Sequence, residues 1–167
     1  MKIMFKPIFL FLLLAIASWM TFAQAEGLPV VQDFTVEAKE SREKQAPIMV
    51  LFMSNSCSYC ETVLNDFLLP MQRDPQYNNR VILRQIETDS KNKLIDFDGT
   101  TTTHSAFSSK HLEWGVPTVM LFDSQGNVLT SIVGLLTVDF YLAYLDNAIS
   151  ESQAKIKAAE KPQSPTI

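Results

Sequence analysis

The pattern of hydrophobic and polar positions predicts helices and strands in alternation along the chain. Residues 33–45 are mostly charged and only weakly amphipathic, and they predict a helix that ends before Pro47. Residues 48–53 form a continuous apolar run, which is typical of a strand buried on both faces of a sheet. This order of elements favours an α/β fold with a central sheet.

Three further segments predict the other strands of this sheet. They cover residues 80–86, 118–122 and 128–133. Only five residues, 123–127, separate the last two segments, and they include the turn formers Asp123 and Gly126. We therefore expect the last two strands to form an antiparallel hairpin.

Two more helices are predicted where apolar residues recur every three or four positions. The first begins at Cys57, after a turn at 54–56, and Pro70 predicts a kink or a stop. Its apolar face consists of Cys60, Leu64, Phe67 and Leu68. The second is capped by Thr137 and carries Phe140, Tyr141, Tyr144, Leu145 and Ile149. Residues 151–167 are polar, and we expect them to form a disordered tail.

The first 25 residues predict a secretory signal peptide. Lys2 and Lys6 form a basic start, residues 8–22 are an almost unbroken apolar run, and Ala23-Gln24-Ala25 supplies small residues for cleavage. Export to the periplasm or beyond follows, with the cut after Ala25. The alternative is an uncleaved anchor in the membrane, although a span needs roughly 20 apolar residues.

Removal of this leader leaves an acidic chain of 142 residues, enough for one domain with a core. It keeps 12 Lys and Arg against 18 Asp and Glu, a formal charge of −6. An acidic chain without a basic stripe is not expected to bind nucleic acid. We divide the chain into a signal peptide (1–25), an N-terminal helical extension (26–45), a main domain (46–150) and the tail (151–167).

The two cysteines, Cys57 and Cys60, suggest reversible chemistry rather than a structural staple. A disulfide across two intervening residues constrains little of the unfolded chain. A close pair suits thiol–disulfide exchange, in which one thiol attacks and the other resolves the mixed disulfide. Cys57 falls at the predicted helix start, where backbone N–H groups and the helix dipole favour a thiolate. We assign Cys57 as the attacking thiol and Cys60 as the shielded, resolving one.

On four features the sequence resembles the thioredoxin superfamily. These are Cys57-Ser58-Tyr59-Cys60 after an apolar strand, Gly115-Val116-Pro117-Thr118 before another, Asp123 and Gly126 at the hairpin, and Gly134 before the last helix. The resemblance implies a thioredoxin fold, a mixed sheet flanked by helices, with a cis-proline at Pro117 against the cysteines. It also implies that the backbone of Val116 pairs with an extended substrate chain. The implied substrate-binding residues are Tyr59, Val116, Pro117 and Thr118.

Within the superfamily the chain looks most similar to the exported SoxW-like thioredoxins. An insert at 90–112 precedes the cis-proline strand, and we expect it either to lie at the rim of the site and affect partner choice or to be a surface loop without a role. Ser56 replaces the tryptophan and Leu51 the buried acid of cytosolic thioredoxins. Deprotonation of Cys60 must then rely on water, another group or the leaving substrate thiol. Glu61 is the nearest acid and is expected to point to solvent.

The resulting prediction is a partner-specific reductase that acts on exported proteins containing cysteine. It implies a redox partner, such as a membrane electron donor, a monomer and no cofactor. A disulfide oxidase or isomerase is an alternative, as is a copper-binding module for metalloprotein assembly. A zinc site of the two cysteines with His104 and His111 does not match the spacing of compact zinc modules, so no metal is assigned.

Overall fold

The computed structural model describes residues 27–160 of the chain. The predicted signal peptide (1–25) and residues 161–167 of the predicted tail lie outside the described residues. The elements in chain order are α2 (Phe34–Lys44), β1 (Ile48–Met53), α3 (Ser58–Thr62), η1 (Val63–Leu68), α4 (Leu69–Arg73), η2 (Pro75–Tyr77), β2 (Ile82–Glu87), β3 (Lys93–Ile95), β4 (Thr101–Thr103), α5 (His104–His111), β5 (Thr118–Phe122), β6 (Val128–Val133) and α6 (Val138–Glu160). No helix among these residues is long and apolar enough to cross a membrane.

Four strands form a mixed sheet in the order β2-β1-β5-β6. β1 runs parallel to β2 and antiparallel to β5, and β5 is antiparallel to β6, which confirms the expected hairpin. The predicted strands at 48–53, 118–122 and 128–133 have the expected bounds, and the strand predicted at 80–86 spans Ile82–Glu87. The fold is the mixed α/β thioredoxin-like fold that the sequence predicts.

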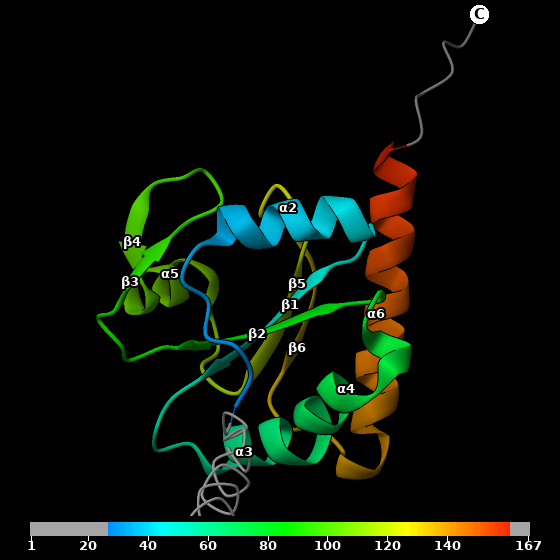
Figure 1. The fold of residues 1–167 in the computed structure, drawn as a ribbon. Helices are drawn as coiled ribbons and strands as arrows, with labels where there is room; N and C mark the ends of the chain where they lie inside the picture. Colours follow the sequence, from blue (N-terminus) through cyan, green and yellow to red (C-terminus); the bar gives the residue numbers. More distant parts are fainter. Residues whose placement is uncertain (1–26, 161–167) are drawn as a thin grey trace, which may run out of the picture.

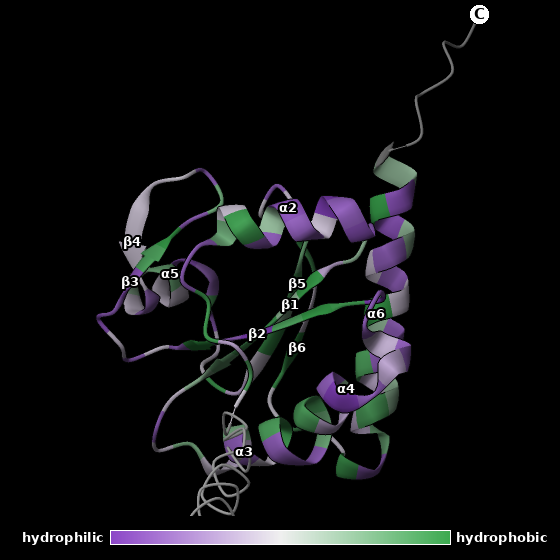
Figure 2. Ribbon diagram, viewed as in Figure 1, coloured by the Kyte–Doolittle hydropathy of each residue, from purple (hydrophilic) through white to green (hydrophobic). Residues whose placement is uncertain are grey.

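Hydrophobic cores lie on both faces of this sheet, because the side chains of β1 alternate between them. Met49 and Leu51 join a core that the helical segment 58–73 and α6 cover. Ile48, Val50 and Phe52 join a second core, which α2 and the segment 93–111 cover. Figure 1 shows these two layers of helices on either side of the strands. Hydrophobic residues concentrate on the strands and hydrophilic ones along α2 (Figure 2).

Helix α2 spans Phe34–Lys44, one residue shorter at each end than the predicted 33–45, and belongs to the second core. The Asp33 side chain accepts a hydrogen bond from the Thr35 N–H at 2.8 Å and caps the helix start. Gln45 ends the helix with a left-handed backbone, φ 51°. The Phe34 ring is fully buried and stacks on Phe107 at 4.8 Å between ring centroids. The segment expected as an N-terminal extension is therefore packed on the domain.

The helix after the cysteines does not stop at Pro70 but continues to Arg73. A π-helical turn, η1, lies immediately before the proline, and the Leu69 N–H donates to the Leu64 carbonyl five residues back. A proline inside an α-helix lacks an N–H and its ring clashes with the carbonyl four residues earlier, here that of Asp66. The wider turn provides room for the ring without ending the helix.

The insert at 90–112 is part of the core, not a surface loop. It forms the two-stranded sheet β3–β4 and helix α5. Phe107 is 1% exposed and Phe97 stacks on Phe34 at 4.3 Å between ring centroids. The tip of the insert packs at Gly126, in the β5–β6 turn, at the end of the sheet far from α3 (Figure 1). The expectation that the insert lies at the rim of the site is therefore wrong for this tip.

The expectation of a disordered tail from residue 151 is wrong for residues 151–160, which extend α6. The Lys155 ammonium donates to the Leu129 carbonyl of β6 at 2.7 Å and forms an ion pair with Glu151 one turn earlier. Ser152 is fully buried. These contacts stabilise residues 151–160 as a helix although their composition is polar.

Candidate active site

Cys57 and Cys60 form a disulfide at the start of the helix that follows β1. Their sulfur atoms are 2.08 Å apart and their Cα atoms 5.2 Å apart. β1 ends at Met53, and the Cys57 N–H donates to the Ser54 carbonyl to close the turn. The polar residues 54–56 break the apolar run, so the chain turns there and starts α3. The strand, turn, cysteine pair and helix therefore stand in the predicted order.

The two sulfur atoms have different surroundings. Cys60 is fully buried, whereas Cys57 is partly exposed. The Cys57 sulfur accepts a hydrogen bond from the Cys60 N–H at 3.1 Å, since Cys57 occupies the N-cap position of α3. After reduction, this N–H and the helix dipole would stabilise a thiolate at Cys57. An incoming sulfur can reach Cys57 more readily than Cys60.

The Pro117 loop lies at the same end of the sheet as the disulfide. Phe52 in β1 pairs with Thr118 in β5, so Pro117 falls beside the end of β1 that leads to the cysteines. The Val116–Pro117 peptide bond is cis. The Pro117 carbonyl accepts from the Gly134 N–H at 2.8 Å, which joins this loop to the segment before α6.

Val116, immediately before the proline, has backbone groups available for pairing. Within residues 27–160, neither its N–H nor its carbonyl has a hydrogen-bond partner. Its side chain is half-buried against the second core. The loop is thus fixed while the Val116 backbone stays free to pair with an extended chain.

The other two predicted binding residues differ in accessibility. Tyr59 is 67% exposed beside Cys60 and is free to touch a partner. Thr118 is 1% exposed, and its hydroxyl donates to the Gly115 carbonyl at 2.7 Å. Thr118 therefore positions the loop, and its expected role in substrate binding stays a prediction.

Three exposed apolar residues beside the site were not identified from the sequence. Trp114, 80% exposed, precedes the Pro117 loop, and Val133 pairs with Thr118. Leu136, 67% exposed, follows Gly134. Their positions in the sequence could have identified them, because each lies within three residues of Pro117 or of Gly134. Their exposure could not be predicted, because it depends on the fold.

No buried acid is available to take the proton of Cys60 by direct analogy with cytosolic thioredoxins. Leu51 is fully buried in the first core. The acids that are buried in the described part of the chain, Glu37 and Asp96, are paired with Arg84 and Lys110. Glu61 is exposed, as expected. Water, the departing substrate thiolate or a group outside these buried acids is left to take the proton of Cys60.

The two histidines lie in different places: His104 lies beside β2, and His111 lines a pocket with Trp114 and Thr118. His104 is buried, and its Nδ1 accepts a hydrogen bond from the Glu87 N–H at 3.4 Å. His111 stacks against Phe107, and burial lowers its pKa, with Lys110 adding to the effect. Among residues 27–160, no group of three or more His, Cys, Asp or Glu is placed to hold a metal ion.

Comparisons with known proteins give one family and a set of distant structures. The model of the thioredoxin-like domain family matches residues 34–149. A thioredoxin-fold protein from Helicobacter pylori is 16% identical, over 69% of this chain and 86% of its own, with a TM-score of 0.46. A mutant thioredoxin from Halobacterium salinarum is 19% identical, over 75% of this chain and 91% of its own, with a TM-score of 0.46. No curated protein sequence matches the chain.

Proposed function

Because this chain belongs to the thioredoxin-like domain family, we propose that it is an exported, partner-specific thiol–disulfide reductase that works through Cys57 and Cys60. One observation carries the proposal. A partly exposed Cys57 at a helix start is bonded to a buried Cys60, at the sheet end where the Val116 backbone is unpaired.

The exchange proceeds in two steps that pass two electrons to the substrate. The Cys57 thiolate attacks one sulfur of a substrate disulfide, and the other substrate sulfur leaves as a thiolate and takes up a proton. Cys60 then loses its proton, and its sulfur attacks Cys57 in the mixed disulfide. This step forms the Cys57–Cys60 bond and releases the second substrate thiol. A dithiol electron donor reduces the pair again.

The shielding of Cys60 supports this division of roles. A substrate sulfur cannot reach Cys60, so the mixed disulfide forms at Cys57. The Val116 backbone and the exposed Tyr59 ring would hold the substrate chain across the disulfide. The resemblance to SoxW-like thioredoxins supports the reducing direction, as does Ser58-Tyr59, which supplies no cation to stabilise the Cys57 thiolate.

Trapping of the mixed disulfide tests the mechanism. Cys60→Ser should accumulate a covalent complex with a disulfide-containing protein such as insulin, because no thiol remains to resolve it. Cys57→Ser is the matched control and should trap nothing, since Cys60 is buried. Equal trapping by both variants, or by neither, would contradict the proposal.

Two further measurements address the direction and the compartment. Equilibration with glutathione gives the reduction potential, and a reductase requires a value well below that of the glutathione pool. An oxidase would show a value above it, and tight stoichiometric Cu(I) binding by the reduced protein would favour the copper module. Export predicts that the protein recovered from cells begins at Glu26.

A further inference from the structure

Exposed apolar residues flank the disulfide, the Pro117 loop and the start of α6 along the chain. We call this set the docking face, and it consists of Tyr59, Trp114, Val133, Leu136, Phe140 and Tyr144. Their exposed fractions range from 38% for Val133 to 80% for Trp114. Solvent-exposed aromatic side chains in such a group are typical of sites that bind other proteins.

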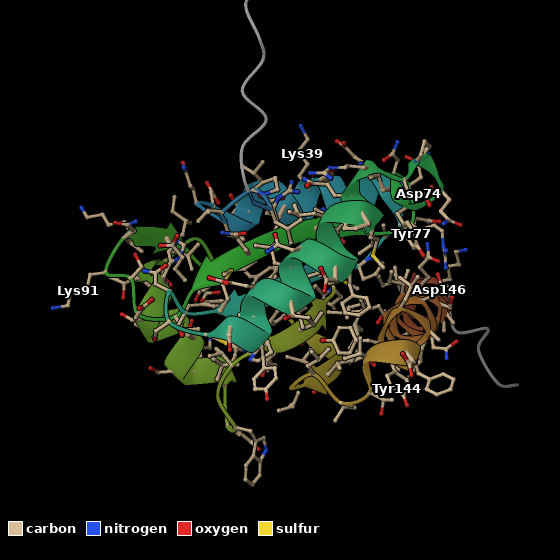
Figure 3. All side chains as sticks on the ribbon, turned by 90° about the horizontal axis from the view of Figure 1, so that it is seen from below. Lys39, Asp74, Tyr77, Lys91, Tyr144 and Asp146 are labelled. Carbon is tan, nitrogen blue, oxygen red and sulfur yellow. A yellow bond between two sulfur atoms is a disulfide. The ribbon has the colours of Figure 1, made fainter. Side chains whose placement is uncertain are left out.

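The members of the docking face stand near the reactive pair, the Pro117 loop or the start of α6 along the chain, and Tyr59 lies between the two cysteines. Trp114, Thr118 and Val133 line one pocket of about 280 Å³ at the β6 edge of the sheet. On the other side of the Pro117 loop, Leu136 follows Gly134, whose N–H donates to Pro117. Phe140 and Tyr144 lie one turn apart on α6, and Tyr144 points away from the molecule (Figure 3).

The lining of this pocket suits an apolar side chain. Trp114, Met120 and Val133 line it, with Glu113 and His111 beside them. We expect it to take one apolar side chain of a polypeptide that lies across the disulfide.

The charged residues nearest to the docking face along the chain are of one sign. Within two positions of its members, every charged residue is an acid: Glu61, Glu113, Asp139 and Asp146. Three exposed acids, Glu61, Glu113 and Asp139, lie within two residues of Tyr59, Trp114 and Phe140. None of the three has an ion-pair partner in the described part of the chain. Lys39 and Lys91 lie on other sides of the molecule from Tyr144 (Figure 3).

From this charge pattern we infer that the docking face binds a cationic polypeptide. The preferred segment has Lys or Arg near the reactive cysteine and an apolar side chain that enters the pocket at Trp114. The inference rests on the proposed function and names its substrate class. Two copies of this face would bring unpaired carboxylates together, which opposes a self-dimer, and an anionic lipid surface would be repelled.

Two matched peptides test the inference directly. Each carries one cysteine, present as its disulfide with thionitrobenzoate, and one tryptophan, and they differ only in flanking residues, lysine in one and glutamate in the other. The Cys57 thiolate attacks the peptide sulfur and thionitrobenzoate leaves as a coloured thiolate. Cys60 then closes the disulfide and releases the peptide thiol, so release of colour reports the rate.

The rate ratio of the lysine peptide to the glutamate peptide should be about ten or more in roughly 10 mM salt. It should approach one in roughly 1 M salt, where the screening length is about 3 Å. Since thionitrobenzoate peptides differ in intrinsic reactivity, each rate is divided by the rate with free glutathione as the thiol. Any salt dependence of the corrected ratio then results from the charges on the protein surface.

Charge reversal locates the effect. The double variant Glu113→Lys and Asp139→Lys should lower the ratio at least about fivefold in low salt. The matched control, Glu43→Lys with Glu151→Lys, makes the same change in net charge on parts of α2 and α6 outside the docking face and should keep the wild-type ratio. In single turnovers of the reduced protein, Trp114→Ala should raise the concentration of lysine peptide that gives half the maximal rate, whereas Val36→Ala, which changes an exposed apolar residue on α2, should not.

Each outcome decides one of the two proposals. A ratio near one with fast colour release, or a preference for glutamate, overturns the cationic substrate class and leaves the redox proposal standing. Rates that fall with protein concentration while dimers form would assign the face to a second copy and overturn the inference. Absence of colour release with both peptides overturns the proposed function itself.

Discussion

At the scale of single residues, the position of each sulfur determines its part in the reaction. Cys57 caps a helix and is partly exposed, and Cys60 lies one turn later and is buried. Burial disfavours the charged form of a thiol, so the second step needs help with the proton of Cys60. Leu51 cannot accept this proton. We expect the leaving substrate thiolate to take it up as Cys60 attacks the mixed disulfide.

Tyr141 contributes a stability that depends on pH. Its ring is fully buried beside Phe67, its hydroxyl has no hydrogen-bond partner in residues 27–160, and burial raises its pKa from 10 to about 12. The folded state therefore disfavours the tyrosinate. The stability is complete below pH 10, where the unfolded chain is also neutral, and is lost as the pH rises through about 12.

We predict that Tyr141→Phe increases the free energy of unfolding by about 1 kcal/mol at pH 7, because an unpaired buried hydroxyl is removed. It should also abolish a loss of about 2–3 kcal/mol between pH 10 and 12. Urea denaturation across this range measures both effects. Tyr144→Phe, on the exposed side of α6, is the control, and an alkaline loss as large in Tyr141→Phe as in the wild type would contradict the assignment.

Gly126 is required by the β5–β6 turn and by the insert together. Its φ is +85°, and a Cβ would lie 2.8 Å from the Phe97 ring. We predict that Gly126→Ala lowers the free energy of unfolding by about 2–4 kcal/mol. Gly99→Ala has the same backbone strain, φ +81°, with no atom within 4 Å, and should cost only about 1–2 kcal/mol. Equal costs in urea denaturation would show that Phe97 does not pack on this turn.

At the scale of elements, the sequence predicts those whose signal is local. β1 is an unbroken apolar run, and the β5–β6 hairpin has a five-residue turn with Asp123 and Gly126, so both were predictable. The π-helical turn before Pro70 could not be predicted, because a proline can either end a helix or distort it. The helix beyond residue 150 was missed because its support, the contact of Lys155 with Leu129, joins residues 26 apart.

The insert shows the same limit more clearly. Its strands have three residues each, and Thr101–Thr103 contains no apolar side chain to indicate a strand. The burial of Phe107 depends on Phe34, Phe52 and Phe122, which come from three other elements. The periodicity of a single segment cannot indicate a cluster that is built from several elements. The sequence therefore predicted only that the insert lies at the rim of the site or forms a surface loop.

We predict that Phe107→Ala lowers the free energy of unfolding by about 3–5 kcal/mol, since it removes a buried ring from the second core. Phe140→Ala, which removes an identical ring that is 60% exposed, should cost less than about 1 kcal/mol. Thermal or urea denaturation of the two variants gives the comparison. Similar small losses would mean that the insert is only loosely attached.

At the scale of the whole molecule, the site was largely predictable and its surroundings were not. The cysteine spacing, the strand before it and Gly115-Val116-Pro117-Thr118 identify the elements that meet at one end of the sheet. The exposure of Trp114, Val133 and Leu136 in the docking face could not be predicted, because exposure depends on how the whole chain packs. Glu61, Glu113 and Asp139 are exposed and have no ion-pair partner in the described part of the chain, so negative charge lies next to Tyr59, Trp114 and Phe140 along the sequence.

The unequal reactivity of the two thiols is the central claim, and competitive alkylation tests it most directly. The reduced, folded protein is treated at neutral pH with limiting iodoacetamide, and mass spectrometry measures the modification of each cysteine over time. We predict that Cys57 reacts at least about 100-fold faster than Cys60, and that Cys60 reacts only after unfolding. Equal rates in the folded protein, or faster reaction at Cys60, would contradict the assignment of Cys57 as the attacking thiol.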